Sequence, residues 1–210
     1  MNIEVSEELK SKCPEFRGIA VEAWVSNTAF SKELWQEIDV FTQQLRAESN
    51  VDDCKEQYAI AATRTAYRRC GKDPSRYRPS AEALRRRLLR GLELYQIDTL
   101  VDIINLVSLQ TGYSIGGFDA GKIVGNKLVL GIGRGVLNID GLPVYRDNIG
   151  GIGTPTSDNE RTKIDLNTQH LLVIINGYSG AKGLQEAADL TLNLLKRYAS
   201  LTKSEVMSFE

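Results

Sequence analysis

Three polar residues interrupt an otherwise apolar stretch, and they are the first candidates for chemistry. Asp102, Asn105 and Ser108 stand at i, i+3 and i+6 within residues 99–110. A helix would bring them roughly to one face. A carboxylate in the interior must be paired or hydrogen-bonded, because burying it alone is costly. Two interpretations stay open: Asp102 holds an arginine or caps a loop from beneath, or the polar stripe lines a pocket for a polar ligand.

Two further segments could complete the walls of such a pocket. A Gly-Gly-Phe-Asp turn follows the apolar stretch, and glycine lets backbone approach a ligand closely. Residues 148–162 combine glycine, threonine, serine and aspartate, and donors of this kind can orient a water molecule or an oxyanion. The same composition is also typical of an exposed loop. The predicted pocket residues are Asp102, Asn105, Ser108, Gly116, Gly117, Asp119, Arg161 and Thr162.

A strongly basic segment lies between residues 63 and 91. It contains ten basic residues, nine of them arginine, against two acids, Asp73 and Glu82. Guanidinium groups bind phosphate and the rings of Tyr67 and Tyr77 could stack on unpaired bases, so the segment is predicted to bind RNA. Arginine also suits internal ion pairs, which leaves a structural interpretation open. The RNA-binding candidates are Arg68, Arg69, Arg85, Arg86 and Arg87.

Other signals argue against several common chemistries. Residues 131–135 have dinucleotide-like glycines, but a hairpin pattern follows them where a nucleotide site needs a helix. His170 is the only histidine, and no serine has the context of a nucleophile elbow. Transition-metal ligands are too few. The sequence therefore predicts no cofactor and no metal, and it leaves the catalytic residues unassigned.

Bulk composition narrows the setting of the protein. Its 210 residues are 42% apolar, enough for a substantial core, and a net charge of -1 gives no general affinity for polyanions or membranes. Cys13, Cys54 and Cys70 are odd in number and lack metal-site spacing, which fits a reducing compartment. No apolar run approaches the roughly 20 residues of a bilayer span. We predict a cytoplasmic protein without a membrane partner, and the oligomeric state stays open.

Both helices and strands must position these residues. The predicted strands cover residues 18–25, 127–130, 135–139, 142–145 and 170–176, the last fully buried. One predicted helix begins after Ser31. Four further helices are predicted over residues 51–67, 80–90, 99–110 and 183–200. The Asp140-Gly141 pair favours a tight hairpin between two of the strands. We therefore predict a single domain of mixed α/β (α+β) class over residues 1–210.

Several of these segments together resemble a known family, the B3/B4 module of the phenylalanyl-tRNA synthetase beta subunit. The resemblance lies in residues 78–84 (RPSAEAL), in Val101-Asp102, Asn105 and Val107-Ser108-Leu109, and in Gly117-Phe118-Asp119. Stand-alone relatives of the module typically show Lys-Asp-Pro followed by Tyr-Arg-Pro-Ser, which are residues 72–74 and 77–80 here. The likeness covers about residues 18–198.

The resemblance implies a β-sandwich-like core with flanking helices, and a function connected with tRNA. The synthetase module hydrolyses the ester of tRNA mischarged with tyrosine, so we expect a protein that binds tRNA or other RNA and hydrolyses mischarged aminoacyl-tRNA in trans. A complete synthetase is not expected, because its other modules are missing from these residues. Where the synthetase module has His-Ala-Phe-Asp, this sequence has Gly116-Gly117-Phe118-Asp119, so a histidine associated with the editing pocket is absent.

Two alternatives to this expectation stay open. The first is a non-catalytic module that binds an amino-acid-like small molecule and does not bind tRNA. The second is an adaptor for RNA or protein that has no working pocket. Salt dependence distinguishes the first from the RNA-binding protein, since counterion release makes RNA affinity fall steeply with salt.

Overall fold

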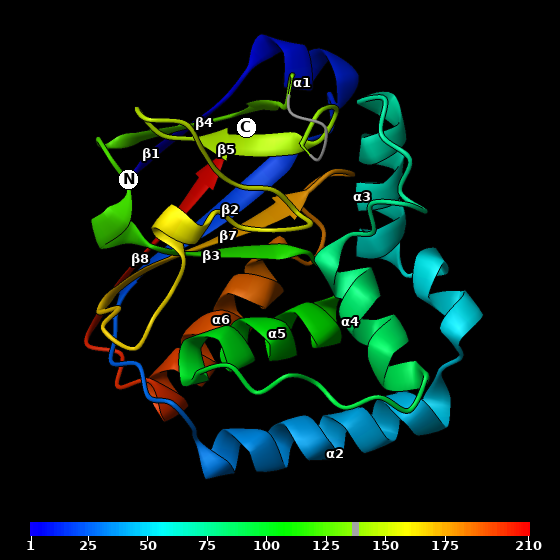
Figure 1. Cartoon of the computed structure of the whole chain (residues 1–210), viewed down its shortest axis with the longest axis vertical. Coiled ribbons are helices and arrows are strands. Elements are labelled where there is room, and N and C mark those ends of the chain that lie inside the picture. The colour runs from blue at the N-terminus through cyan, green and yellow to red at the C-terminus, as the bar shows by residue number, and fades with distance from the viewer. Residues whose placement is uncertain (136–138) are drawn as a thin grey trace.

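Helices and strands are interleaved along the chain in the computed structural model, which describes residues 1–135 and 139–210 (Figure 1). The α-helices are α1 (Glu7–Lys12), α2 (Lys32–Glu48), α3 (Tyr58–Arg69), α4 (Ser80–Leu89), α5 (Thr99–Thr111) and α6 (Leu184–Tyr198). The strands are β1 (Asn2–Val5), β2 (Arg17–Trp24), β3 (Ile115–Asp119), β4 (Lys127–Ile132), β5 (Pro143–Arg146), β6 (Gly151–Gly153), β7 (His170–Gly177) and β8 (Lys203–Phe209). Short 3-10 helices cover Val51–Glu56, Ala120–Lys122 and Glu160–Thr162.

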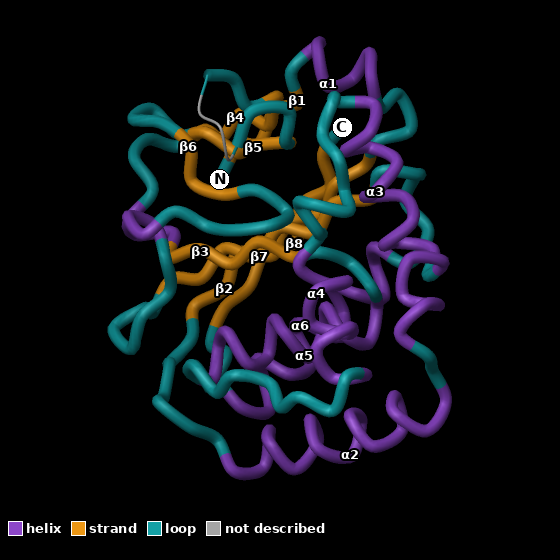
Figure 2. The backbone as a smooth tube through the Cα atoms, turned by 45° about the vertical axis from the view of Figure 1, so that its right-hand side comes forward, coloured by secondary structure: helices purple, strands orange, loops and turns teal. Residues whose placement is uncertain are grey.

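Two four-stranded sheets form the centre of the molecule. One has the order β3-β7-β2-β8 and is antiparallel throughout. The other has the order β1-β4-β5-β6, in which only the β1–β4 pair is parallel. Helices α5 and α6 cover one face of the first sheet with α2 beyond them, and the second sheet lies across the other face (Figures 1 and 2). The predicted mixed α/β fold, with a sandwich-like core and flanking helices, is confirmed.

Strand β7 is apolar along its length because it separates two cores. Leu171, Val173 and Ile175 pack in the core between the sheet and the helices, whereas Leu172 and Ile174 pack in the core between the two sheets. Successive strand residues point to opposite faces, so a strand covered on both faces has no solvated side. The predicted buried strand over residues 170–176 is therefore confirmed.

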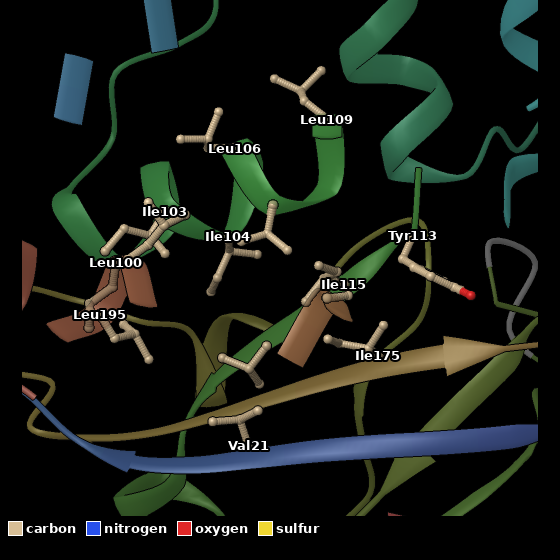
Figure 3. Packing of buried hydrophobic residues seen from close by; sticks show 14 of the residues in the cluster. Val21, Leu100, Ile103, Ile104, Leu106, Leu109, Tyr113, Ile115, Ile175 and Leu195 are labelled. Atoms are coloured by element: carbon tan, nitrogen blue, oxygen red, sulfur yellow. The ribbon is translucent and has the colours of Figure 1, made fainter. Parts of the chain in front are cut away.

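Helix α5 is buried on most of its circumference. The Asp98 side chain accepts a hydrogen bond from the Val101 N–H at 2.9 Å and caps its start, and Gly112 ends it with a φ of +79°. Such a left-handed residue favours glycine, which has no Cβ to clash. Figure 3 shows the apolar side chains of α5 gathered above the strands of the first sheet and beside α6. The helix therefore holds any polar side chain that it carries in a fixed place.

The structure differs from the predicted elements in several places. Residues 51–67, predicted as one helix, form a 3-10 helix and then α3, because Gln57 adopts an extended ψ of 132°. Asn50 and Asp53 hydrogen-bond each other at 3.3 Å, and short polar side chains of this kind favour turns over helix. Strands β1, β3, β6 and β8 and helix α1 were not predicted, and residues 116–119, predicted as a turn, belong to β3. The predicted strand over residues 135–139, and with it the predicted Asp140-Gly141 hairpin, falls mostly on residues 136–138, outside the described part of the chain, and β5 pairs with β4.

No helix in the described part of the chain combines the length and the apolar character that crossing a bilayer requires.

Candidate functional site

A cavity of about 130 Å³ lies where α4, α5, β3 and the loop of residues 154–158 meet. Its apolar wall consists of Leu84, Val101, Ile104, Ile115 and Ile164. The rest of the lining consists of Ser80, Asn105, Ser108, Gly117, Thr154, Thr156, Ser157 and Asp158. Pockets for drug-sized ligands usually measure roughly 300–1,000 Å³. A cavity of this size therefore holds one small group of a ligand, with the remainder outside.

The loop that closes the cavity is tied to two helices. The Ser80 N–H, at the start of α4, donates to the Pro155 carbonyl at 2.9 Å. The Thr156 hydroxyl lies 2.8 Å from the hydroxyl of the fully buried Tyr67 on α3, and it donates to the Arg78 carbonyl at 3.3 Å. These contacts fix the loop against the N-terminal end of α4. They give the cavity a preformed wall.

Within the loop, Thr154 organises the turn. Its hydroxyl accepts hydrogen bonds from the N–H groups of Thr156 and Ser157 at 3.1 and 3.0 Å, and donates to the Ser157 carbonyl at 3.1 Å. A hydroxyl that bonds its own following backbone replaces strand pairing with a turn. The turn places Ser157 and Asp158 at the cavity.

Four polar side chains of the cavity are free to bind a ligand. Ser80, Asn105, Ser157 and Asp158 form no side-chain hydrogen bond with any described residue. Ser108 differs, because its hydroxyl donates to the Tyr113 carbonyl at 2.6 Å. The free groups supply an amide, two hydroxyls and a carboxylate, which together can donate and accept hydrogen bonds.

The carboxylate of Asp158 is enclosed although the residue as a whole is exposed. Its Oδ1 atom lies 2.7 Å from the position that a Cβ would occupy on Gly153, so the carboxylate lies close against the backbone of that glycine. Enclosure by protein atoms raises the pKa of Asp158 from 3.8 to about 7. The upward direction follows from that enclosure, because no described cation or donor stabilises the charged form. The carboxyl group therefore exchanges its proton near neutral pH.

Three of the eight predicted pocket residues, Asn105, Ser108 and Gly117, line the cavity. Asp102 does not. It is buried, and it accepts hydrogen bonds from Trp35 Nε1 at 2.7 Å and from the Ile97 N–H at 3.2 Å. Burial raises the pKa of Asp102 against these stabilising hydrogen bonds. The residue therefore anchors α2 and the segment before α5, away from the cavity.

The other predicted pocket residues also lie outside the cavity lining. Asp119 accepts a hydrogen bond from the Thr168 hydroxyl at 2.9 Å. The Arg161 guanidinium donates two hydrogen bonds to the Asp147 carboxylate, at 2.8 and 2.9 Å. These bonds, together with backbone N–H donors, lower the pKa of Asp147 although burial opposes the shift. The two remaining residues outside the lining are Gly116 and Thr162. The structure thus brings three of the eight predicted residues together at this cavity, and the assignment of the eight to a ligand pocket stays a prediction.

The five predicted RNA-binding arginines occupy different environments. Arg68 and Arg69 are exposed at the end of α3. Arg85 and Arg86 are half-buried and donate to backbone carbonyls of α5 and of the Val51–Glu56 turn, at 2.6 and 3.1 Å. Arg87 lies with its guanidinium carbon 3.9 Å from the ring centre of the exposed Tyr95. Arg85 and Arg86 therefore make internal contacts, although Arg86 also lines a hollow at the surface.

The sequence prediction missed Ser80, Ser157 and Asp158 as individual cavity residues. The composition of residues 148–162 did indicate hydrogen-bonding capacity, but composition does not show which side chains turn inward. Among the described residues, no cluster of three or more histidine, cysteine, aspartate or glutamate side chains is arranged to hold a metal ion. The three cysteines are free and buried.

Comparison with known proteins identifies the family. The B3/4 domain family matches residues 62–199, a region that includes α4, α5, β3 and the loop of the cavity. Among solved structures, a similar one is an N-terminal fragment of the phenylalanyl-tRNA synthetase beta-subunit from Pyrococcus horikoshii. It has 12% identity and a TM-score of 0.47, with 98% of this chain and 50% of that chain covered. This chain thus spans about half the length of that fragment. No curated protein matches.

The family match covers 138 of the 210 residues, counted from 62 to 199 inclusive. The predicted resemblance is confirmed, and the protein belongs to the B3/4 domain family.

Proposed function

We propose that this protein binds the aminoacyl end of an RNA in the cavity and hydrolyses the ester bond in trans, with residues 1–210 acting as one B3/4 unit in the cytoplasm. The main support is the set of unpaired polar groups, Asn105, Ser157 and Asp158, beside an apolar wall. An amino acid carries both kinds of surface. The resemblance to the editing module of phenylalanyl-tRNA synthetase is consistent with an aminoacyl ester as the ligand.

Asp158 has the chemistry that the hydrolysis needs. Among the described residues that line the cavity it alone is an acid or a base, and a carboxylate with a pKa of about 7 accepts a proton well at neutral pH. A water molecule attacks the ester carbonyl while Asp158 removes its proton. The bond between the carbonyl carbon and the ribose oxygen breaks, and the proton passes to that oxygen. The products are a free amino acid and an RNA with a hydroxyl end.

Deacylation assays with a panel of mischarged tRNAs test this proposal. We expect hydrolysis above background for at least one aminoacyl group, and a loss of about 100-fold or more in rate for Asp158→Asn, because a positioned general base contributes about 10²- to 10⁴-fold. Glu160→Gln is a matched control, since Glu160 lies in the same region, is exposed and is absent from the cavity lining. No hydrolysis of any member of the panel at high protein concentration would contradict the catalytic proposal.

A second candidate function is the binding of a free amino acid without catalysis. The described residues that line the cavity include no cysteine, histidine or lysine, and these are common nucleophiles and bases. Calorimetry with free amino acids separates the two functions. Binding of an amino acid, together with no deacylation and no affinity for RNA, would favour the second candidate.

A further inference from the structure

A second hollow, of about 250 Å³, lies on the outer side of α4 and is lined mainly by arginines. Its lining consists of Arg76, Arg78, Arg86, Arg87 and Arg90, with Ala83 and Leu92. We call it the arginine groove. It differs from the set of arginines predicted from the sequence, because Arg68, Arg69 and Arg85 do not line it. Five guanidinium groups around one hollow create a strongly positive local potential.

One buried acid neutralises part of this charge. Glu82 lies beneath the groove with a side-chain exposure of 2%, and its main partner is the buried Arg64, at 2.7 Å. Its other contacts with arginine are longer, at 4.0 Å to Arg78 and 3.9 Å to Arg86. Most of the charge of Glu82 is therefore committed to Arg64. The groove keeps a positive excess.

The three other arginines have no acidic partner. No described carboxylate lies within 4.0 Å of a side-chain nitrogen of Arg76, Arg87 or Arg90. Like charges that converge on one hollow repel each other, and an anion in the hollow removes that repulsion. Guanidinium groups match phosphate geometry in particular, because their planar forks can donate two hydrogen bonds to one phosphate. The groove is therefore suited to several phosphate groups.

An exposed aromatic ring beside the groove favours nucleic acid over other polyanions. Tyr95 is 67% exposed, and the Arg87 guanidinium stacks on its ring. Bases stack on aromatic rings and on guanidinium planes, whereas phospholipid headgroups and phosphopeptides have no comparable flat surface. Unpaired bases are needed for such stacking, which favours a single strand.

The arginine groove and the cavity share one helix. Helix α4 places Ser80 and Leu84 in the cavity and Ala83, Arg86 and Arg87 in the groove. Residues 78–80 join the two sites, and the Thr156 hydroxyl from the cavity loop donates to the Arg78 carbonyl at 3.3 Å. A strand whose phosphates lie in the groove can therefore present its end to the cavity.

We propose that the arginine groove binds the phosphate backbone of single-stranded RNA, next to the end that enters the cavity. The direction of the strand, with its end in the cavity, rests on the proposed function. RNA binding in the groove itself requires no hydrolysis. The two can therefore fail independently, because binding is measured with RNA that carries no amino acid.

Fluorescence anisotropy with a labelled single-stranded RNA of about 12 nucleotides tests the groove. Each phosphate contact contributes about 0.7 to the log–log salt slope of a single strand, so five contacts give a slope of about -3.5. The informative variant is Arg76→Gln with Arg90→Gln, since neither side chain forms a hydrogen bond or ion pair with a described residue, and its folding should be unaffected. We expect its slope to be about 1.4 smaller in magnitude, and its affinity at about 0.1 M salt to be roughly 25-fold lower.

The matched control is Lys32→Gln with Lys196→Gln, which removes the same charge from exposed positions of α2 and α6 outside the groove. It should leave affinity within about threefold of the wild type if contacts are local. An equal loss in both double variants would overturn the proposal in favour of unspecific attraction. Absence of RNA binding at about 50 mM salt would also overturn it. A third contrary result would be binding to phosphatidylserine vesicles that depends on Arg76 and Arg90, together with RNA binding that does not depend on them.

Discussion

Neutralising Glu82 is the sharpest test of how the basic segment is held together. The Glu82 Oε2 atom lies 2.7 Å from Arg64 Nη1, and the two side chains are only 2% and 10% exposed. Replacing the acid by glutamine in Glu82→Gln keeps the shape of the side chain but leaves Arg64 as a buried cation without an anion. The Pro74 carbonyl, which accepts a hydrogen bond from Arg64 at 3.3 Å, offers only partial compensation.

The expected loss is large because water does not screen this pair. Coulomb's law gives about 6 kcal/mol for unit charges at this separation with an effective dielectric constant of about 20. Part of that attraction offsets the cost of burying both charges, and breaking a buried pair usually costs about 3–5 kcal/mol. Glutamine can retain one hydrogen bond to Arg64. We therefore expect the free energy of unfolding to fall by about 3 kcal/mol.

Urea unfolding followed by tryptophan fluorescence measures this loss, and an exposed pair provides the control. Glu4 and Lys127 lie 2.6 Å apart, nearly the same distance, but are 51% and 44% exposed. Glu4→Gln should therefore cost less than about 1 kcal/mol. If Glu82→Gln and Glu4→Gln lowered the free energy of unfolding by similar amounts, with equal dependence on urea, burial would not be what makes the Arg64–Glu82 pair more stabilising.

Three further changes test the cavity and its loop. Asp158→Asn should raise the free energy of unfolding relative to the wild type at about pH 8 but not at about pH 4. The reason is that folding raises the pKa of Asp158 from 3.8 to about 7, so its ionised form weakens the fold as pH rises. Urea titrations at both pH values measure the difference. Gly117→Ala would place a Cβ 2.4 Å from Ile104 Cδ1 and push that side chain towards the cavity, so calorimetry should show ligand affinity at least about tenfold lower, with a stability loss of about 1–3 kcal/mol. Tyr67→Phe removes the 2.8 Å hydrogen bond to Thr156, and urea unfolding should show a loss of about 1 kcal/mol.

Elements with a strong side-chain pattern were predictable from the sequence, and those built on backbone pairing were not. Strand β7 and helix α5 are apolar at nearly every position because each is covered on most sides. Strand β8 is different. Its residues Lys203–Phe209 are mostly exposed, and it exists through pairing with β2 in an antiparallel register. Backbone hydrogen bonds leave little trace in the side-chain sequence, so such an edge strand has no clear signal.

The polar stripe on α5 was predictable in spacing but not in direction. Each step of three residues turns about 60° backwards around a helix, so Asp102 and Ser108 differ by about 120° in direction. Asp102 therefore meets Trp35 on α2, while Asn105 and Ser108 reach the cavity. Placing the stripe would have required knowing which elements pack on each side of α5. That information lies in tertiary contacts.

The basic segment illustrates a related limit, since one kind of residue performs two tasks on the same helix. On α4, Arg85 binds a carbonyl of α5 and helps to hold the helix in place, Arg87 lines the arginine groove, and Arg86 does both through its contacts with Val51 and Glu82. Because α4 and the cavity loop are joined through the Ser80 N–H and the Thr156 hydroxyl, the groove and the cavity are held at a constant separation. A flexible attachment would have to be ordered before one ligand could contact both places, which costs conformational entropy, whereas these hydrogen bonds already hold the two together.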